Sequence, residues 1–202
     1  MYLDELLQAD NFTLATSRIA QSFRERHGLP LLHQLGIVIP NIEAAAAELE
    51  AKGIGPFFIL SGSPVFWNER RMLRDVNVKL GIAYYRGVEI ELIEPVGNAE
   101  FYGNHLDPGG RMVVHHLGFI VDDVDRYAEM LETEGSTTWV RGTIRTFPTT
   151  AEFAYMDTVG KAGIIVEFIT MRLLGLRVPI PHAVFHALGR AEKALGIKCM
   201  PL

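Results

Sequence analysis

The chain has 202 residues, 49% of them hydrophobic and 21% charged, which is enough to bury one large core or two small modules that share one. The formal charge of −5, with no run of Lys and Arg, excludes the usual signature of a nucleic-acid-binding surface. The single cysteine, Cys199, excludes an internal disulfide and a cysteine-based zinc site.

The first ten residues carry Asp4 and Glu5, where a secretory signal needs positive charge followed by an apolar run. No apolar stretch approaches the roughly 20 residues that cross a bilayer. We therefore expect a cytoplasmic protein that does not enter a membrane.

A repeat organises the sequence. Residues 33–54 align without gaps with residues 115–136, and the offset from Gln34 to His116 is 82 residues. This offset is too long for a solenoid unit and fits a duplicated half-domain. The identical pairs are His33/His115, Leu35/Leu117, Gly36/Gly118, Ala46/Ala128, Leu49/Leu131, Glu50/Glu132 and Gly53/Gly135.

The first half of the chain divides into an N-terminal helical extension, residues 1–31, and a module over residues 32–95. In the extension, the pattern predicts a helix from about Thr13 to Arg26, ended by Gly28 and Pro30. The module is predicted as β-α-β-β-β, with a polar loop from Ser61 to about Asp75. Its elements are a strand at 32–39, a helix capped by Asn41 and ended before Gly53, and strands at 57–60, 76–85 and 88–93, the last two joined by a turn at Arg86-Gly87.

A Pro-, Gly- and Asn-rich linker over residues 96–113 separates this module from a second one over residues 114–170. The second module repeats the order, with a strand at 115–121, a helix at 123–134 capped by Asp123, and strands near 137–140, 152–156 and 164–169. Residues 171–202 form a C-terminal helical tail, amphipathic from Pro181 to Ile197. Its apolar side is predicted to cover the sheet or to join two chains in a homodimer, and it carries Val184, Leu188, Ala191 and Leu195.

Strand alternation sorts the side chains of the two repeated strands onto two faces. Gln34 and Gly36 share the more open face of the first strand, and His116 and Gly118 share that of the second. His115, like Leu117, is expected beneath the sheet. The glycine two residues beyond each polar side chain is interpreted as leaving space for a ligand, although a strand glycine can equally mark a bulge.

The last strands of the two halves each place a carboxylate inside an apolar run, at Glu91 and Glu167. A buried carboxylate costs several kcal/mol, roughly, unless a proton, a counter-charge or a metal neutralises it. Together with Gln34 and His116, these carboxylates form a set of three oxygen ligands and one nitrogen. Such a set suits an octahedral divalent ion better than a closed structural zinc site.

Plainer interpretations stand beside this one. His116 alone is more often a buried core histidine than a ligand, and either glutamate could pair with Arg111 or Arg145. A shift of one residue in register would replace Gln34 and His116 by His33 and His115. We reject that register because it would turn Leu35 and Leu117 into the polar face.

These motifs resemble the vicinal oxygen chelate superfamily, over about residues 32–170. The resemblance implies an α+β fold in which two βαβββ modules pair into an open, cup-shaped mixed β-sheet, with extra N- and C-terminal helices. Within the superfamily, the set Gln34, Glu91, His116 and Glu167 matches the ligands of glyoxalase I, which acts as lactoylglutathione lyase. The closest motifs to methylmalonyl-CoA epimerases are His116-Leu117-Gly118-Phe119-Ile120-Val121-Asp122-Asp123-Val124-Asp125, Gly55-Pro56-Phe57-Phe58 and Gly160-Lys161-Ala162-Gly163.

The resemblance implies a divalent-metal-dependent isomerase or lyase that removes a proton beside a metal-bound carbonyl. The metal is Zn, Ni, Co or Mn, and the substrate is a small carbonyl compound or thioester. By family analogy Glu167 takes the α-proton, and Glu91 returns it on the other side. Epimerases usually carry His/Gln/His/Glu ligands, from which Gln34 and Glu91 depart.

Two other functions remain open. Some superfamily members sequester small molecules without metal, but they have lost the ligands that this chain retains. An extradiol-type dioxygenase uses a His/His/carboxylate iron site and requires histidine where Gln34 stands. For the epimerase or lyase, the loop arginines Arg70, Arg71 and Arg74 are candidates to contact a phosphate or carboxylate of the substrate, although a solvated charge run explains them equally.

Overall fold

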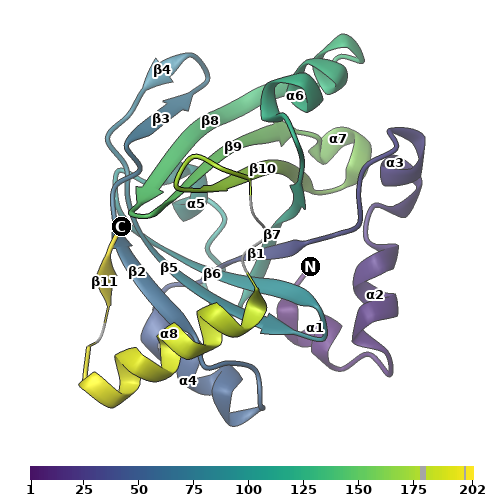
Figure 1. Ribbon diagram of the computed structural model, residues 1–202. Coiled ribbons are helices and arrows are strands. Elements are labelled where there is room, and N and C mark those ends of the chain that lie inside the picture. Colours follow the sequence, from purple (N-terminus) through teal and green to yellow (C-terminus); the bar gives the residue numbers. More distant parts are fainter. Residues whose placement is uncertain (178–180, 198) are drawn as a thin grey trace.

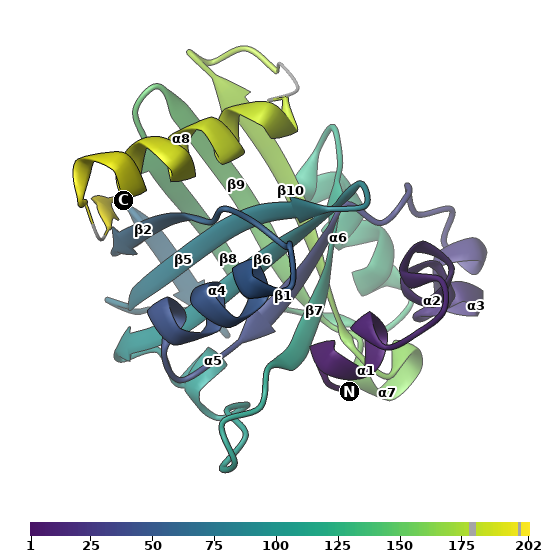
Figure 2. The same cartoon turned by 90° about the horizontal axis from the view of Figure 1, so that it is seen from below.

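The computed structural model of the protein describes residues 1–177, 181–197 and 199–202 (Figure 1). In this part of the chain, eleven strands form one mixed sheet that curls into an open cup (Figures 1 and 2). The predicted α+β fold with two βαβββ units is confirmed. Residues 178–180 and 198 of the predicted C-terminal tail lie outside the described residues.

The N-terminal extension and the first module contain the following elements: α1 (Leu3–Leu7), α2 (Phe12–Arg18), α3 (Gln21–Arg26), β1 (Gln34–Val38), α4 (Ile42–Ala51), β2 (Phe58–Gly62), β3 (Phe66–Glu69), β4 (Met72–Leu73), β5 (Asn77–Tyr85) and β6 (Val88–Gly97). The linker and the second module contain α5 (Glu100–Gly103), β7 (Val113–Ile120), α6 (Val124–Thr133), β8 (Thr137–Thr146), β9 (Thr149–Asp157), α7 (Val159–Ala162) and β10 (Ile165–Leu173). The tail contains α8 (His182–Leu195) and β11 (Met200–Pro201).

The two halves join through β1 and β7. The strand order is β11-β2-β5-β6-β1-β7-β10-β9-β8-β3-β4. Within each half the first strand pairs in parallel with the last, β1 with β6 and β7 with β10. Antiparallel pairing of β1 with β7 then places all four of these strands at the centre of the sheet.

The helices α4 and α6 cover the outer side of the sheet, one for each half. The predicted caps are confirmed, because Asn41 accepts a hydrogen bond from the amide of Ala44 (2.8 Å) and Asp123 one from that of Arg126 (3.1 Å). The apolar sides of the helices pack on the outward-facing residues of the central strands. This outer core includes Leu35, Ile37, Ile42, Leu49, Leu117, Phe119, Val124, Leu131, Val166 and Phe168.

The prediction of a polar loop over residues 61–75 is wrong. These residues contain the hairpin of β3 and β4, and β3 pairs with β8 of the other module. Trp67 of β3 is almost fully buried among aromatic side chains inside the cup. The hairpin therefore connects β2, near one edge of the sheet, with β8, near the other (Figure 1).

Two other segments differ from the predicted secondary structure. The single helix predicted from Thr13 to Arg26 is divided in two, because Ala20 adopts a left-handed conformation (φ 51°) between α2 and α3. The segment expected to be only a linker contains α5, which buries Phe101 and Tyr102 beside the inner face of the sheet.

The predicted C-terminal helix is present, but the residues that anchor it differ from the expected ones. α8 lies across β2 and β5 and buries Phe185, Gly189 and Glu192 (Figure 2). Leu195, from the predicted apolar side, is 72% exposed, while Val184 and Leu188 are partly exposed. The homodimer inferred from this side of the helix stays a prediction. No helix in the described ranges is long and apolar enough to cross a membrane.

The two repeat-equivalent caps offer a first test of the fold. We expect Asn41→Ala and Asp123→Ala each to lower the free energy of unfolding by about 1 kcal/mol, because each leaves a first-turn amide without its acceptor. Urea denaturation measures the change, with Asp10→Ala at an exposed position as the control. Equal stability of all three variants would contradict the assigned capping role.

Candidate metal centre

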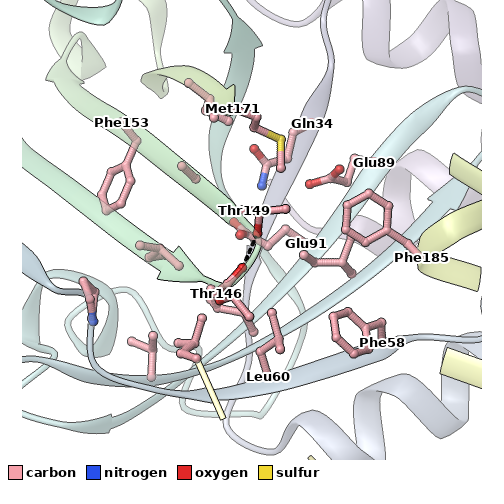
Figure 3. Close-up of a pocket in the computed structure, with 18 of the residues that line it drawn as sticks. Gln34, Phe58, Leu60, Glu89, Glu91, Thr146, Thr149, Phe153, Met171 and Phe185 are labelled. Carbon is pink, nitrogen blue, oxygen red and sulfur yellow. Dashed lines mark hydrogen bonds between the residues drawn. The ribbon is translucent and has the colours of Figure 1, made fainter. Parts of the chain in front are cut away.

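The four predicted ligands come from the four central strands, one from each. Gln34 lies on β1, Glu91 on β6, His116 on β7 and Glu167 on β10. The carboxylate and imidazole atoms of Glu91, His116 and Glu167 lie within 4.8 Å of one another. Gln34 and Glu91 point into the same cavity on the inner side of the cup (Figure 3). The structure therefore brings Glu91, His116 and Glu167 together, with Gln34 on the wall of the same cavity.

The carboxylates of this group converge on the imidazole of His116. Nε2 of His116 lies 3.0 Å from Oε2 of Glu167 and 3.6 Å from Oε2 of Glu91. Among the described residues, no hydrogen-bond partner is present for Nε2 of His116, Oε2 of Glu167 or Oε1 of Gln34, all of which are buried. Buried polar atoms normally form hydrogen bonds, so these atoms have capacity for a further partner beyond the ion-pair contact between His116 and Glu167.

A divalent cation satisfies this requirement. Two carboxylates, an amide oxygen and an imidazole nitrogen are ligands that a divalent transition ion accepts, with positions left for water or substrate. The residues present therefore fit the metal that the sequence predicted. Neither arginine considered as an alternative partner of the carboxylates is at the site: Arg111 pairs with Asp4 (3.0 Å) on the surface, and Arg145 is exposed and does not line the cavity.

Two glycines make room for two of the ligands. Gly36 lies between Glu91 and His116 in the sheet, and Gly118 lies between Gln34 and Glu167. A Cβ at Gly36 would fall 1.8 Å from Cε1 of His116, and one at Gly118 would fall 2.4 Å from Oε1 of Gln34. The expectation that these glycines leave space for a ligand needs correction: each gives room to the ligating side chain of the neighbouring strand.

His115 also differs from its predicted position beneath the sheet. The β1–β7 register shifts between Gly36 and Ile37, so that His115 is an extra residue in a β-bulge. Its ring packs against Phe101 and Tyr102, and its Nδ1 lies 3.1 Å from Nδ1 of His116. This contact occupies the second nitrogen of His116 and leaves Nε2 directed at the carboxylates. Burial, and then His116, lowers the pKa of His115 well below its usual range, so the ring is neutral.

The inner face carries one acidic residue that the sequence analysis missed. Glu89 is buried two residues before Glu91, on the same face, and lines the same cavity (Figure 3). Its carboxylate accepts a hydrogen bond from the hydroxyl of Tyr84 and lies 3.5 Å from Nε2 of His33. The two-residue spacing on one strand was the signal that could have identified it.

Burial and like charge together make the carboxylate group unfavourable without a cation. Burial is the largest cause that raises the pKa of Glu91 well above its usual range, followed by the nearby charges of Glu167 and Glu89. Tyr102 and Tyr155 share a hydrogen bond between their hydroxyls (2.9 Å), and burial raises the pKa of both, so they remain uncharged.

The other candidates lie elsewhere. Arg70 stacks over Trp139 (4.7 Å from the ring centre), and the arginines of the β3–β4 hairpin do not line the cavity. Asp122 pairs with Arg126, and Asp125 lies 2.9 Å from Arg141. Asp122, Asp123 and Asp125 at the start of α6 are therefore engaged in ion pairs or capping, away from the cavity.

Comparison with known proteins identifies the family of the chain. A profile of the Glyoxalase/Bleomycin resistance protein/Dioxygenase superfamily matches residues 33–155, more than half of the chain. The chain belongs to this superfamily. The match spans both modules from β1 to β9 and confirms the resemblance that the motifs had indicated. No curated protein matches the chain.

Solved structures share the fold at low identity. They include a methylmalonyl-CoA epimerase of Streptomyces coelicolor in complex with 2-nitronate-propionyl-CoA (18% identity, TM-score 0.53, 75% of this chain and 99% of that one). A methylmalonyl-CoA epimerase of Mycobacterium tuberculosis has 15% identity and a TM-score of 0.50 over 76% of this chain and 90% of that one. A hypothetical protein of Bacillus halodurans C-125 has 14% identity and a TM-score of 0.50, over 68% and 91%. This likeness establishes the fold and not the reaction.

The glycine beside His116 can be tested by substitution. We expect Gly36→Ala to lower the affinity for zinc on the order of 10–100-fold, because the added methyl group displaces the His116 ring. Isothermal titration with zinc measures the change. Gly97→Ala is the control, because its Cβ would meet only Asn77 at an ordinary 3.8 Å. Unchanged zinc affinity in Gly36→Ala would show that the space beside Gly36 is not required for His116 to bind zinc.

The Glu91 carboxyl should make the stability of the metal-free protein depend on pH. The unfolded chain releases this proton near the usual value of 4.5, whereas the folded protein holds it to higher pH. The unfolding free energy should therefore fall as pH rises above that value, until the raised pKa is passed. We expect Glu91→Gln to lose less stability over this range in urea denaturation with a chelator present. A parallel pH dependence in both proteins would contradict this.

Proposed function

We propose that the protein is a divalent-metal-dependent isomerase or lyase that removes a proton beside a substrate carbonyl. The observation that supports this most strongly is the convergence of ligand atoms from Glu91, His116 and Glu167 within 4.8 Å of one another, while Gln34 lines the same cavity with its amide oxygen free of hydrogen bonds among the described residues. Such a group is costly to fold, because buried polar atoms within it lack a hydrogen-bond partner among the described residues. The group lies on the face of the sheet that lines a cavity, where a substrate could reach it.

The proposed roles divide between holding and proton transfer. Gln34, Glu91, His116 and Glu167 would hold Zn, Ni, Co or Mn, which supplies Lewis-acid stabilisation of the charge that develops on the substrate oxygen. Glu167 takes the proton from the α-carbon, and Glu91 returns a proton from the opposite side. His115 fixes the ring of His116 through the contact between their Nδ1 atoms.

The finer choice lies between an epimerase-like and a lactoylglutathione-lyase-like reaction. The motif around His116 favours an epimerase. The ligand set favours the lyase, because Gln34 and Glu91 stand where epimerases usually carry histidine and glutamine. We therefore propose only the step that both reactions share, which is proton transfer beside a bound carbonyl.

Two competing functions find less support. A metal-free binding protein has no need for buried ligand atoms without partners, such as those at His116 and Glu167. An extradiol dioxygenase needs a second histidine at the site. The nearest other imidazoles, His33 and His115, are engaged with Glu89 (3.5 Å) and His116 (3.1 Å).

Replacement of the proposed base tests the reaction. We expect Glu167→Gln to slow α-proton exchange on the order of 10²–10⁴-fold, because an amide cannot accept the proton. The measurement is deuterium incorporation, followed by NMR, from a panel of carbonyl and thioester compounds in D₂O with zinc, nickel, cobalt or manganese. Glu152→Gln on the neighbouring strand β9, where the side chain is 38% exposed, is the control. Exchange at the wild-type rate in Glu167→Gln would remove this residue from the mechanism.

A further inference from the structure

The metal centre opens into a cavity whose walls are almost entirely apolar. The cavity measures about 480 Å³, within the range of small-molecule sites. Aliphatic and aromatic side chains from both modules line it, including Phe58 and Leu60 of β2 and Phe153 of β9 (Figure 3). Its ionisable groups are gathered at the end where the proposed metal ligands lie.

The wall contains no Lys or Arg side chain among the described residues. The groups that can carry charge there are His33, Glu89, Glu91 and Glu167. Nearby Arg141 is engaged elsewhere, because it pairs with Asp125 and donates to the carbonyl of Phe153 (3.0 Å). A carboxylate or phosphate on the body of a substrate would therefore be buried without a counter-charge and close to three acidic residues. Burial of an unpaired anion is strongly unfavourable.

The helix α8 supplies one wall of this cavity. Val184, Phe185 and Leu188 line it on one side of the helix. The helix is held in place by Gly189, where a Cβ would fall 2.6 Å from the carbonyl oxygen of Phe57, and by Glu192, which accepts a hydrogen bond from the amide of Ile59 (2.9 Å). α8 lies outside residues 33–155, the part that matches the superfamily. This wall is thus an addition to the matched part of the fold.

We propose that α8 makes the site selective for uncharged, largely apolar carbonyl compounds and excludes substrates with an anionic group on the body. This inference deepens the proposed function and rests on it for the metal-bound head group. Among the described residues, the only fully buried side-chain polar atoms of the wall without a hydrogen bond, besides those of Gln34 and Glu167, are the indole nitrogen of Trp67 and the hydroxyl of Thr146, both neutral. They can serve a neutral polar group on the substrate and cannot neutralise an anion.

A matched pair of metal-binding probes tests the selectivity. Octanohydroxamic acid presents two oxygens and a neutral alkyl chain, and its analogue with a terminal carboxylate differs only in charge at the far end. In titration calorimetry with the zinc-loaded protein, we expect the neutral probe to bind at least about tenfold more tightly, since burial of the lone carboxylate costs affinity. Equal or tighter binding of the charged probe would overturn the inference.

A matched pair of variants tests the role of the helix. Leu188→Lys places a cation in the wall, at a side chain that is 37% exposed and therefore tolerant of substitution. We expect it to weaken the neutral probe and strengthen the charged one, each by about tenfold or more. Leu195→Lys, on the same helix but 72% exposed and outside the lining, should change neither. The same preferences in Leu188→Lys as in the wild type would show that α8 does not set selectivity.

A metal-free measurement separates this inference from the proposed function. Zinc titration first shows whether the centre binds a metal at all. Displacement of the dye Nile red from zinc-free protein by octanol and by octanoate then reports the preference of the cavity alone. Failure to bind zinc with a retained preference for octanol would overturn the proposed function and leave the inference in place. Zinc binding together with a preference for octanoate would overturn the inference and leave the proposed function in place.

Discussion

The pairing of β1 with β7 is the contact on which the structure depends. It joins the two halves, and its register places a glycine of each strand opposite a polar side chain of the other, Gly36 opposite His116 and Gly118 opposite Gln34. Each glycine is needed because no Cβ fits beside the neighbouring side chain. The duplication of the sequence thus becomes a reciprocal arrangement in which each half supplies space for a ligand of the other.

This arrangement concentrates negative charge at the bottom of the cup. Glu91 and Glu167 approach the same imidazole nitrogen, Glu89 lies behind them, and the described residues around the cavity include no Lys or Arg. A divalent cation resolves the repulsion and satisfies the buried ligand atoms. The same lack of basic side chains that calls for a metal also limits what else the cavity can hold, so a single electrostatic feature connects the proposed chemistry with the proposed substrate class.

Segments outside the aligned repeat, residues 33–54 and 115–136, shape the rest of the cavity. The β3–β4 hairpin brings Trp67 into the cup from the first module while pairing with the second. The short helix α5 places Phe101 and Tyr102 against His115, beside the metal centre. α8 adds an apolar wall across β2 and β5. None of these three segments belongs to the aligned repeat. They form the surroundings of the four proposed ligands, whereas the central strands fix the positions of those ligands.

The sequence alone determined the doubled βαβββ order, the two caps, and the four residues proposed as ligands, because strand alternation and the 82-residue offset are local or periodic properties. Only the tertiary structure decided the position of His115, which depends on a bulge in the β1–β7 pairing, and the path of residues 66–73, which depends on a partner strand more than 60 residues away. It also decided which side of α8 is buried. Val184 and Leu188 had the periodicity of a core face, yet they line a cavity, because Gly189 allows the helix to approach the chain at Phe57 from a different side.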